Sequence, residues 1–221
     1  CGGFTKEDTE DALIELNFLG IDNVLALRGD AIKSEPAFIP ERDGHAHATD
    51  LIRQIAGLNK GKYLHDEEQE AAPTDLCIGA ACYPEKHAEA LNLAVDIAYL
   101  KQKVDAGAEY LVTQMFYDNA KYFRFVELCR AEGINVPIIP GLKPLTTMKH
   151  IAFIPKTFSI DLPQPLAAEL VKCRTDAQVK ELGVEWSIEQ ARELMSKEVP
   201  CVHFYTMGKG EAVQAICEKI R

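Results

Sequence analysis

The sequence predicts an α/β fold of the (β/α)8 TIM-type barrel class. Three observations carry this prediction: the chain has short apolar runs, a helix-like segment follows each run, and polar residues gather where each run ends. In barrel enzymes the active site lies at the carboxyl ends of the strands, so these polar residues are expected to share one pocket. The runs are residues 23–30, 76–87, 110–118, 136–144 and 202–206.

The predicted strand–helix units are fewer than the eight that close a barrel. The chain also begins with Cys1, and its first strand candidate comes only at residue 23. We therefore expect residues 1–221 to be a single catalytic barrel domain, truncated at the N-terminus, that contains about the last five units. An extra helical insertion is expected before the final strand.

The composition indicates which class of protein this is and which kinds of partner it is expected to bind. Hydrophobic residues make up 47% and charged residues 26%, as in an ordinary soluble protein, and the length is enough for one domain with a sizeable core. The net charge of -10 argues against nucleic acid and membrane surfaces as partners. Seven scattered cysteines without a CxxC pair predict a cytoplasmic location. No metal is expected, because His45 and His47 lack a third ligand at a suitable spacing.

The first elements are expected to be a helix over 5–20, a buried strand over 24–27 and a helix over 48–58. Thr5 can cap the first helix, and Gly20 can end it. The apolar stripe of this helix would comprise Ala12, Leu13, Leu16 and Leu19.

The strongest helical pattern follows the second strand, over residues 89–106, with Gly107 as its C-cap. The segment 159–200 is longer than one barrel helix, so it is expected to be the insertion, with two helical stretches and an interruption at Gly183. The other helices are expected at 119–130, 146–153 and 209–220.

Arg28, Gly29 and Asp30 follow the first strand directly. A glycine lets the backbone approach a ligand closely, and an arginine can bind a phosphate or a carboxylate. The alternative is a salt bridge at the rim of the barrel.

Tyr83 and His87 lie at the end of the second strand and could border a planar ring or bond a diphosphate. The alternative is packing at the rim. Asp96, Tyr99 and Lys103 share one face of the helix that follows, where a carboxylate suits ribose hydroxyls and a lysine suits phosphate. Such a face is often merely solvated.

Gln114 ends the third strand, and a carboxamide there can pair with the edge of a heterocycle. Lys143 ends the fourth strand and could form a Schiff base. A lyase or aldolase that uses Lys143 is therefore one possible function of the barrel.

Taken in order, six strings resemble the methylenetetrahydrofolate reductases, FAD-dependent barrel enzymes of one-carbon metabolism. The strings are NVLALRGD, HATDLI, CYPEKHAEA, LKQKVDAGAEYLVTQMFYD, GINVPIIPG and HFYT. They cover nearly the whole chain. The family's general-acid glutamate lies upstream of them, so the resemblance implies that these residues alone are inactive and bind FAD poorly.

The resemblance also implies roles for individual residues. Asp30 and Gln114 would be catalytic, with Asp30 beside the flavin and Gln114 bonded to the pterin or the nicotinamide in turn. FAD contacts would be Arg28, Gly29, Asp30, His47, Ala48, Tyr83, His87, Ala90, Asp96, Tyr99, Gln102 and Lys103. Substrate contacts would be Gln114, His150, Ile154, Tyr205 and Lys209.

The implied reaction is the reduction of 5,10-methylenetetrahydrofolate to 5-methyltetrahydrofolate, with NADH or NADPH as electron donor and FAD as cofactor. The partner would be a small-molecule folate, and a homo-oligomer is expected. Besides the lyase, a third reading is a non-catalytic fragment that only binds or assembles.

Overall fold

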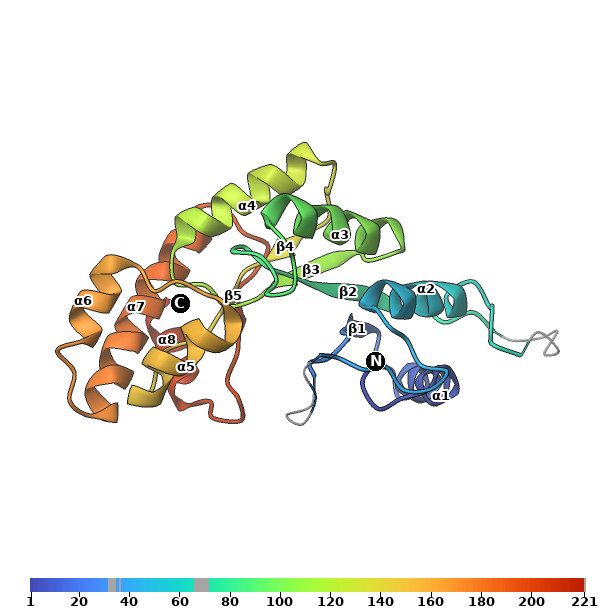
Figure 1. Ribbon diagram of the computed structural model, residues 1–221, viewed down its shortest axis with the longest axis horizontal. Coiled ribbons are helices and arrows are strands. Elements are labelled where there is room, and N and C mark those ends of the chain that lie inside the picture. The colour runs from blue at the N-terminus through green and yellow to red at the C-terminus, as the bar shows by residue number, and fades with distance from the viewer. Residues whose placement is uncertain (32–34, 36, 66–71, 221) are drawn as a thin grey trace. The chain divides into compact units, whose positions relative to one another are not determined.

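A computed structural model of the chain describes residues 1–31, 35, 37–65 and 72–220. Helices and strands alternate along most of it, as Figure 1 shows. The strands are β1 (Asn23–Ala26), β2 (Cys77–Cys82), β3 (Tyr110–Thr113), β4 (Ile138–Ile139), β5 (Gly141–Leu142) and β6 (His203–Phe204). The helices are α1 (Lys6–Phe18), α2 (Ala48–Leu58), α3 (Leu93–Asp105), α4 (Asn119–Ala131), α5 (Met148–Phe158), α6 (Gln164–Leu170), α7 (Asp176–Ser196) and α8 (Glu211–Ile220).

The chain divides into two compact units, and each is described by itself. The first comprises Cys1–Ala81 and Tyr99–Leu111, and the second comprises Cys82–Ala98 and Val112–Arg221. The division passes through β2, α3 and β3, so each unit contains a part of these elements.

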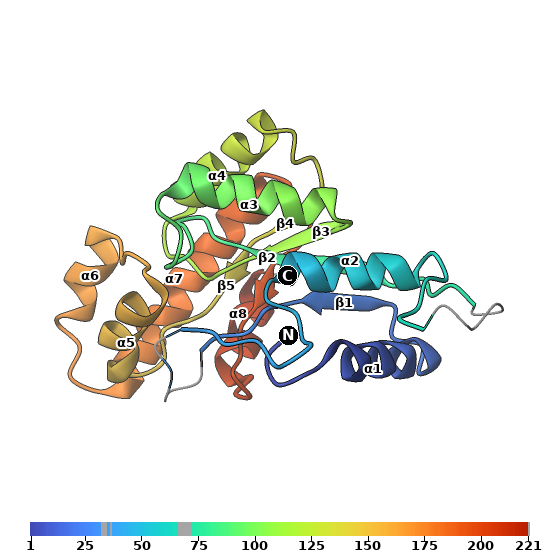
Figure 2. The ribbon, with the colours of Figure 1, turned by 45° about the vertical axis from the view of Figure 1, so that its right-hand side comes forward.

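In the first unit, β1 and β2 pair in parallel, from Asn23 opposite Cys77 to Ala26 opposite Ala80. The helix α2 packs on β1 and runs beside it in Figure 2. The expectation of a buried first strand is wrong, because Leu25 is 40% exposed and Leu27, just after the strand, is 44% exposed. Only one edge of β1 is paired within the described residues, so backbone groups along its other edge lack ladder partners there.

The helix α1 begins where the sequence predicts. Thr5 caps it: its hydroxyl accepts from the Asp8 N–H at 3.1 Å, and the Asp8 carboxylate accepts from the Thr5 N–H at 3.0 Å. The predicted apolar stripe is wrong at Leu19, which is 70% exposed, whereas Leu13 is buried.

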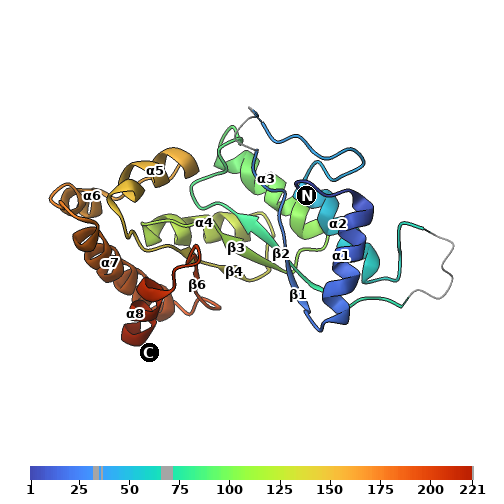
Figure 3. The ribbon, with the colours of Figure 1, turned by 90° about the horizontal axis from the view of Figure 1, so that it is seen from below.

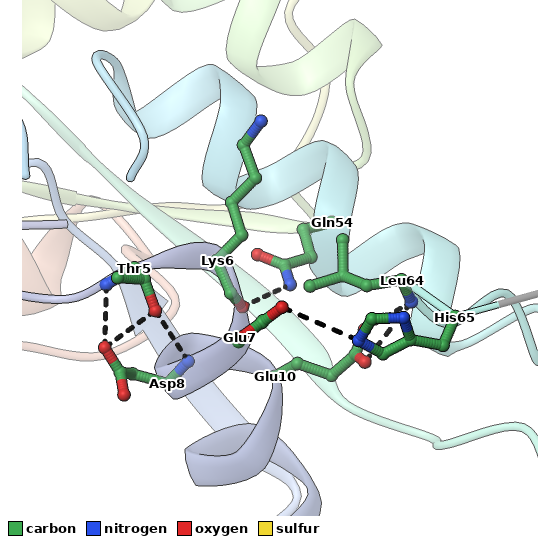
Figure 4. A network of polar contacts seen from close by, with 8 residues as sticks. All are labelled: Thr5, Lys6, Glu7, Asp8, Glu10, Gln54, Leu64 and His65. Carbon is green, nitrogen blue, oxygen red and sulfur yellow. Dashed lines mark hydrogen bonds and ion pairs between the residues drawn. The ribbon is translucent and has the colours of Figure 1, made fainter. Parts of the chain in front are cut away.

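Polar contacts add to the buried Leu13 in holding α1 within the first unit, as Figure 4 shows. The Gln54 amide of α2 donates to the Lys6 carbonyl at 2.9 Å. The buried Glu10 carboxylate accepts from the Leu64 N–H at 3.0 Å, and His65 lies 3.6 Å from the Glu7 carboxylate. A buried carboxylate needs such donors, because an unpaired one would cost several kcal/mol.

The parallel strands confirm the α/β class. The larger sheet has the order β1-β2-β3-β4, and β5 and β6 form a separate parallel pair. The fourth apolar run therefore yields two short strands instead of one, with Pro140 between them. Proline has no N–H to donate, so the ladder is interrupted there. Closure of these strands into a barrel stays a prediction.

The predicted insertion contains α6 and α7, and α6, α7 and α8 follow one another along the left of Figure 3. The predicted interruption at Gly183 is wrong, because α7 runs without a break through this residue. A Cβ at Gly183 would lie 2.0 Å from the Leu145 carbonyl oxygen. The glycine allows α7 to pack directly on the backbone that follows β5.

Two hydrogen bonds also connect α7 to the end of β3. The Trp186 indole N–H donates to the Tyr117 carbonyl at 3.0 Å, and the buried Gln190 amide donates to the Phe116 carbonyl at 3.3 Å. These carbonyls lie past the end of the β3 ladder and would otherwise lack partners. The insertion thus supports the residues that lead from β3 into α4.

Within the described ranges, none of the helices combines the length and the apolar character that crossing a bilayer requires.

Candidate active site

Two strand ends meet at Gln114 in the second unit. The Gln114 N–H donates to the carbonyl of Cys82, the last residue of β2, at 2.8 Å. The half-buried side chain turns back, so that its Oε1 accepts from the Met115 N–H at 3.0 Å. Its Nε2 makes no hydrogen bond within the described part of the chain and is available as a donor.

The pair β5–β6 is tied to the end of β3 by side chains. The Thr113 hydroxyl accepts from the Gly141 N–H at 2.8 Å, and the Tyr205 hydroxyl donates to the Thr113 carbonyl at 2.7 Å. A Cβ at Gly141 would lie 2.3 Å from that carbonyl oxygen, so only glycine fits without displacement. Burial raises the pKa of Tyr205 to about 12, so the hydroxyl stays neutral and remains a donor.

Tyr83 and His87 lie together in the segment between β2 and α3. Their ring centroids are 4.7 Å apart in an edge-to-face arrangement. The predicted α3 start at residue 89 is wrong: the helix begins at Leu93, after Asn92, whose side chain accepts from the Val95 N–H at 2.9 Å.

Asp96 and Ala90 complete this segment. The Asp96 carboxylate accepts from the His87 backbone N–H at 2.7 Å, so one of its oxygens already fixes the chain beside the ring pair. Ala90 is buried. Their predicted contacts with FAD stay predictions.

Basic side chains gather beyond the end of β5. Lys143 is half-buried, burial lowers the pKa of its ammonium, and the group has no hydrogen-bond or ion-pair partner among the described residues. His150, in the first turn of α5, accepts from the Thr146 N–H at 3.2 Å. Burial lowers the pKa of His150, and the charges of Lys143 and Lys209 lower it further, against the opposing effect of Asp176.

Lys143 and Lys209 are thus two cations near His150, in a chain whose net charge is -10. Such cations suit an anionic group of a ligand.

Ile154 lies apart from these groups. It is 1% exposed and packs in an apolar cluster with Met115, Leu145 and Leu166. In this position Ile154 packs against Leu145, which follows β5, and its side chain has almost no exposed surface for a substrate to contact.

In the first unit, Arg28, Gly29 and Asp30 follow β1. The Arg28 guanidinium lies 5.0 Å from the centroid of the Phe38 ring, a cation–π distance. Gly29 has φ +91°, a conformation that other residues rarely adopt. Asp30 is exposed and makes no hydrogen bond or ion pair within the described ranges, so its carboxylate is open to a ligand.

The other predicted cofactor residues of the first unit lie on helices. His47 precedes Ala48 as the N-cap of α2, and its backbone N–H donates to Asp50 at 3.1 Å. On α3, Tyr99 and Gln102 are exposed. The Lys103 ammonium donates to the Ala81 carbonyl near the end of β2, at 2.9 Å.

The structure thus brings Tyr83, Gln114 and Tyr205 to neighbouring strand ends of one unit, as the sequence predicts, whereas Asp30 belongs to the other unit. Sequence reasoning missed Thr113 and gave no role to Gly141, and these two residues join the end of β3 to the β5–β6 pair. The Pro140–Gly141 dipeptide was an available signal for a special backbone position. No group of three metal-ligating side chains occurs in the parts of the chain that the structure describes.

Comparison with known proteins gives a family match over the whole chain. The model of the family described as methylenetetrahydrofolate reductase matches residues 1–221. "Methylenetetrahydrofolate reductase (NADH) 1" of Arabidopsis thaliana is 35% identical over 217 residues, 94% of this chain and 34% of that protein. "Probable methylenetetrahydrofolate reductase (NADPH)" of Caenorhabditis elegans is 32% identical over 223 residues, 100% of this chain and 31% of that protein.

A solved structure shows a similar fold. It is an uncharacterized protein from Clostridium thermocellum that binds two copies of 5-methyl-5,6,7,8-tetrahydrofolic acid. Its TM-score is 0.54 at 18% identity, over 98% of this chain and 68% of that chain. The present chain spans about a third of the length of the curated relatives above. Its match to the family model over residues 1–221 establishes that the chain belongs to the methylenetetrahydrofolate reductase family.

Proposed function

We propose that the protein reduces 5,10-methylenetetrahydrofolate to 5-methyltetrahydrofolate, with NADH or NADPH as electron donor and FAD as bound cofactor. The observation that carries this proposal is the family match over all 221 residues. When bound, FAD supplies hydride transfer, and the protein supplies binding, orientation and electrostatics.

Gln114 fits a role in binding the reacting heterocycles. Its free Nε2 is a donor at the junction of two strand ends, and its Oε1 is fixed by the Met115 N–H. A carboxamide in this position can donate to a ring nitrogen or carbonyl of a pterin, or to a nicotinamide amide. Both ligands could use this one contact in turn.

The basic groups beyond β5 fit the carboxylates of a folate tail. Lys143 and Lys209 are cations near His150, and Lys143 is partly desolvated, which strengthens its attraction for an anion. We therefore propose that His150 and Lys209 contact the substrate, as the resemblance implies, and that Lys143 assists them. Tyr205 would contribute its ring, since its hydroxyl already donates to Thr113.

Asp30 fits a role in stabilising positive charge on the folate. Its carboxylate is exposed and has no ion-pair partner within the described residues. A fixed negative charge directed at developing positive charge lowers the barrier without reorganisation during the step. Arg28, Gly29, His47, Ala48, Tyr83, His87, Ala90, Asp96, Tyr99, Gln102 and Lys103 are proposed FAD contacts by resemblance.

We also propose a cytoplasmic homo-oligomer that does not act on nucleic acid or membranes. All seven cysteines are free, which is consistent with a reducing compartment. The family match supports an oxidoreductase over a Schiff-base lyase that would use Lys143.

The test uses the purified full-length protein under anaerobic conditions. Adding NADH or NADPH is expected to bleach a visible flavin spectrum, and adding methylenetetrahydrofolate is expected to restore it with formation of the methyl product. A protein without flavin absorbance, or one that neither nucleotide bleaches, would contradict the proposal.

Replacing Asp30 separates the two half-reactions. Asp30→Asn is expected to slow folate reduction more than NADH oxidation, because only the folate develops positive charge. Asp11→Asn, which changes an exposed carboxylate of α1, is the control. Equal slowing of both half-reactions would exclude this role for Asp30.

A further inference from the structure

The segment from Tyr83 to His87 has a backbone conformation that requires support. Lys86 has φ +102°, which is costly for a residue with a side chain. The Lys86 ammonium turns back to donate to the carbonyls of His87 at 3.3 Å and Ala90 at 3.1 Å. Lys86 lies between Tyr83 and His87 in the chain, so its backbone conformation affects the relative orientation of their two rings.

Glu85 connects this segment to two other parts of the second unit. Its Oε2 accepts from the Lys121 ammonium in the first turn of α4 and from the Asp161 N–H at 3.1 Å. Lys121 also contacts the Asp161 carboxylate at 2.8 Å. The end of β2, the start of α4 and the chain between α5 and α6 are thereby joined at one carboxylate.

This carboxylate costs free energy where it lies. Its side chain is only 10% exposed, and its Oε1 is buried without a hydrogen bond within the described ranges. Burial raises the pKa of Glu85, and the hydrogen bond and charge of Lys121 oppose that rise. A buried ion pair of this kind is weak evidence for stability, so its value is better sought in the geometry that it fixes.

We propose that Glu85 is a positioning residue for cofactor binding: it fixes the Tyr83–His87 segment in the conformation that contacts FAD. This inference rests on the proposed function. Glu85 itself does not touch the cofactor. Without it, Lys86 loses the neighbour that fixes its strained backbone, and the contact between the two rings opens.

The test compares variants of the full-length protein. Glu85→Ala removes the carboxylate, Glu85→Gln keeps an oxygen that can accept from Asp161, and Glu211→Ala removes a solvent-exposed ion pair with Lys180 as the matched control. We measure the Kd for FAD by visible absorbance and the NMR shifts of the His87 ring protons, which sense the Tyr83 ring.

Glu85→Ala is expected to raise the Kd for FAD by about tenfold or more, as when groups that orient ligand-binding residues are removed from metal sites. The His87 shifts should move toward those of a ring without the edge-to-face contact. Glu85→Gln should recover most of both properties, and Glu211→Ala should stay within about twofold of the unchanged protein, since exposed ion pairs contribute little.

A Kd within twofold for Glu85→Ala, with unchanged His87 shifts, would overturn the inference. If the unchanged protein bound no FAD, the proposed function itself would fail, which is a different result. Should Glu85→Ala not fold, Lys121→Met removes the cation instead, and it must then weaken FAD binding in the same direction for the inference to stand.

Discussion

Helix α7 allows a prediction in which two effects of known size oppose each other. Gly183 lies in the interior of this helix, where alanine is favoured over glycine by about 1 kcal/mol. Helix propensity alone therefore predicts that Gly183→Ala stabilises the protein. The Cβ, however, would lie 2.0 Å from the Leu145 carbonyl oxygen and 2.9 Å from its backbone nitrogen and carbon.

The steric effect should win. Backbone atoms cannot rotate away as a side chain can, so α7 or the segment after β5 must shift. Overpacking of this kind costs about 1–3 kcal/mol, and so close an approach places it near the upper limit. Subtracting the propensity gain leaves a net loss of about 2 kcal/mol, which corresponds to a melting temperature lower by about 4–8 °C for a chain of this length.

The chain supplies a matched control and a local reporter. Gly57 is the matched control and lies near the end of α2. A Cβ added there would lie 3.5 Å from the Lys62 carbonyl oxygen, which is an ordinary van der Waals contact. Gly57→Ala should therefore gain up to about 1 kcal/mol. Trp186, the only tryptophan, follows Gly183 by one helical turn and donates to Tyr117.

Both variants are measured by thermal melting with circular dichroism, and Trp186 fluorescence is recorded at low temperature. Gly183→Ala should lower the melting temperature and shift the Trp186 emission, whereas Gly57→Ala should raise the temperature without an emission change. If both substitutions stabilise the protein equally, α7 does not approach the Leu145 carbonyl as described.

Four further outcomes can be checked. Gly141→Ala should lose about 3 kcal/mol in urea unfolding, because its Cβ would lie 2.3 Å from the Thr113 oxygen and 2.7 Å from the Tyr205 ring; a loss below 1 kcal/mol would contradict the close approach. Thr5→Ala should lose about 1 kcal/mol of stability in thermal melting, whereas Thr147→Ala, at an N-cap without a side-chain hydrogen bond, should lose little; equal losses would refute the capping argument. The His150 ring should titrate by NMR below its ordinary pKa of 6.5, and a midpoint above 6.5 would be incompatible with its burial. Because the folded chain binds this proton less tightly than the unfolded chain, the stability of the protein should fall as the pH drops through 6.5. The exposed Cys201 should react rapidly with a thiol reagent in the native protein, while Cys129, buried and with its pKa raised to about 12 by burial, should react only after unfolding; the reverse order would show that the burial is wrong.

Much of the fold follows from local patterns in the sequence. The helix predicted at 48–58 is found at Ala48–Leu58, because its apolar residues repeat at helical spacing and Ile52, Ile55 and Leu58 are buried. The start of α1 follows from the capping chemistry of Thr5 and Asp8. Such features depend on neighbours in the chain, which a sequence displays directly.

The structural predictions that are wrong share a different cause. Leu19 is exposed at the C-cap of α1, and the helix is held instead by contacts of Lys6 with Gln54 and of Glu10 with Leu64. The glycine at position 183 leaves room for the Leu145 carbonyl, which lies far from it in the sequence, and does not interrupt the helix. Each depends on a partner distant along the chain, and residue type does not reveal that partner.

The candidate site shows the same division. Residue types at the strand ends pointed to Tyr83 and Gln114, and the structure brings their backbones together through Cys82. The sequence did not indicate that the Asp96 carboxylate already accepts from His87, or that Ile154 is enclosed among apolar side chains. How each polar atom is satisfied is a property of the folded chain.

The basic side chains beyond β5 have a consequence for the kinetics of an anionic ligand. The net charge of -10 repels such a ligand at long range, and the attraction of Lys143 and Lys209 extends only over about 8 Å at physiological ionic strength. Added salt screens the distant repulsion during approach and the local attraction after docking. A ligand with carboxylates should therefore associate faster and dissociate faster as the salt concentration rises, so that its residence time shortens even while its capture improves.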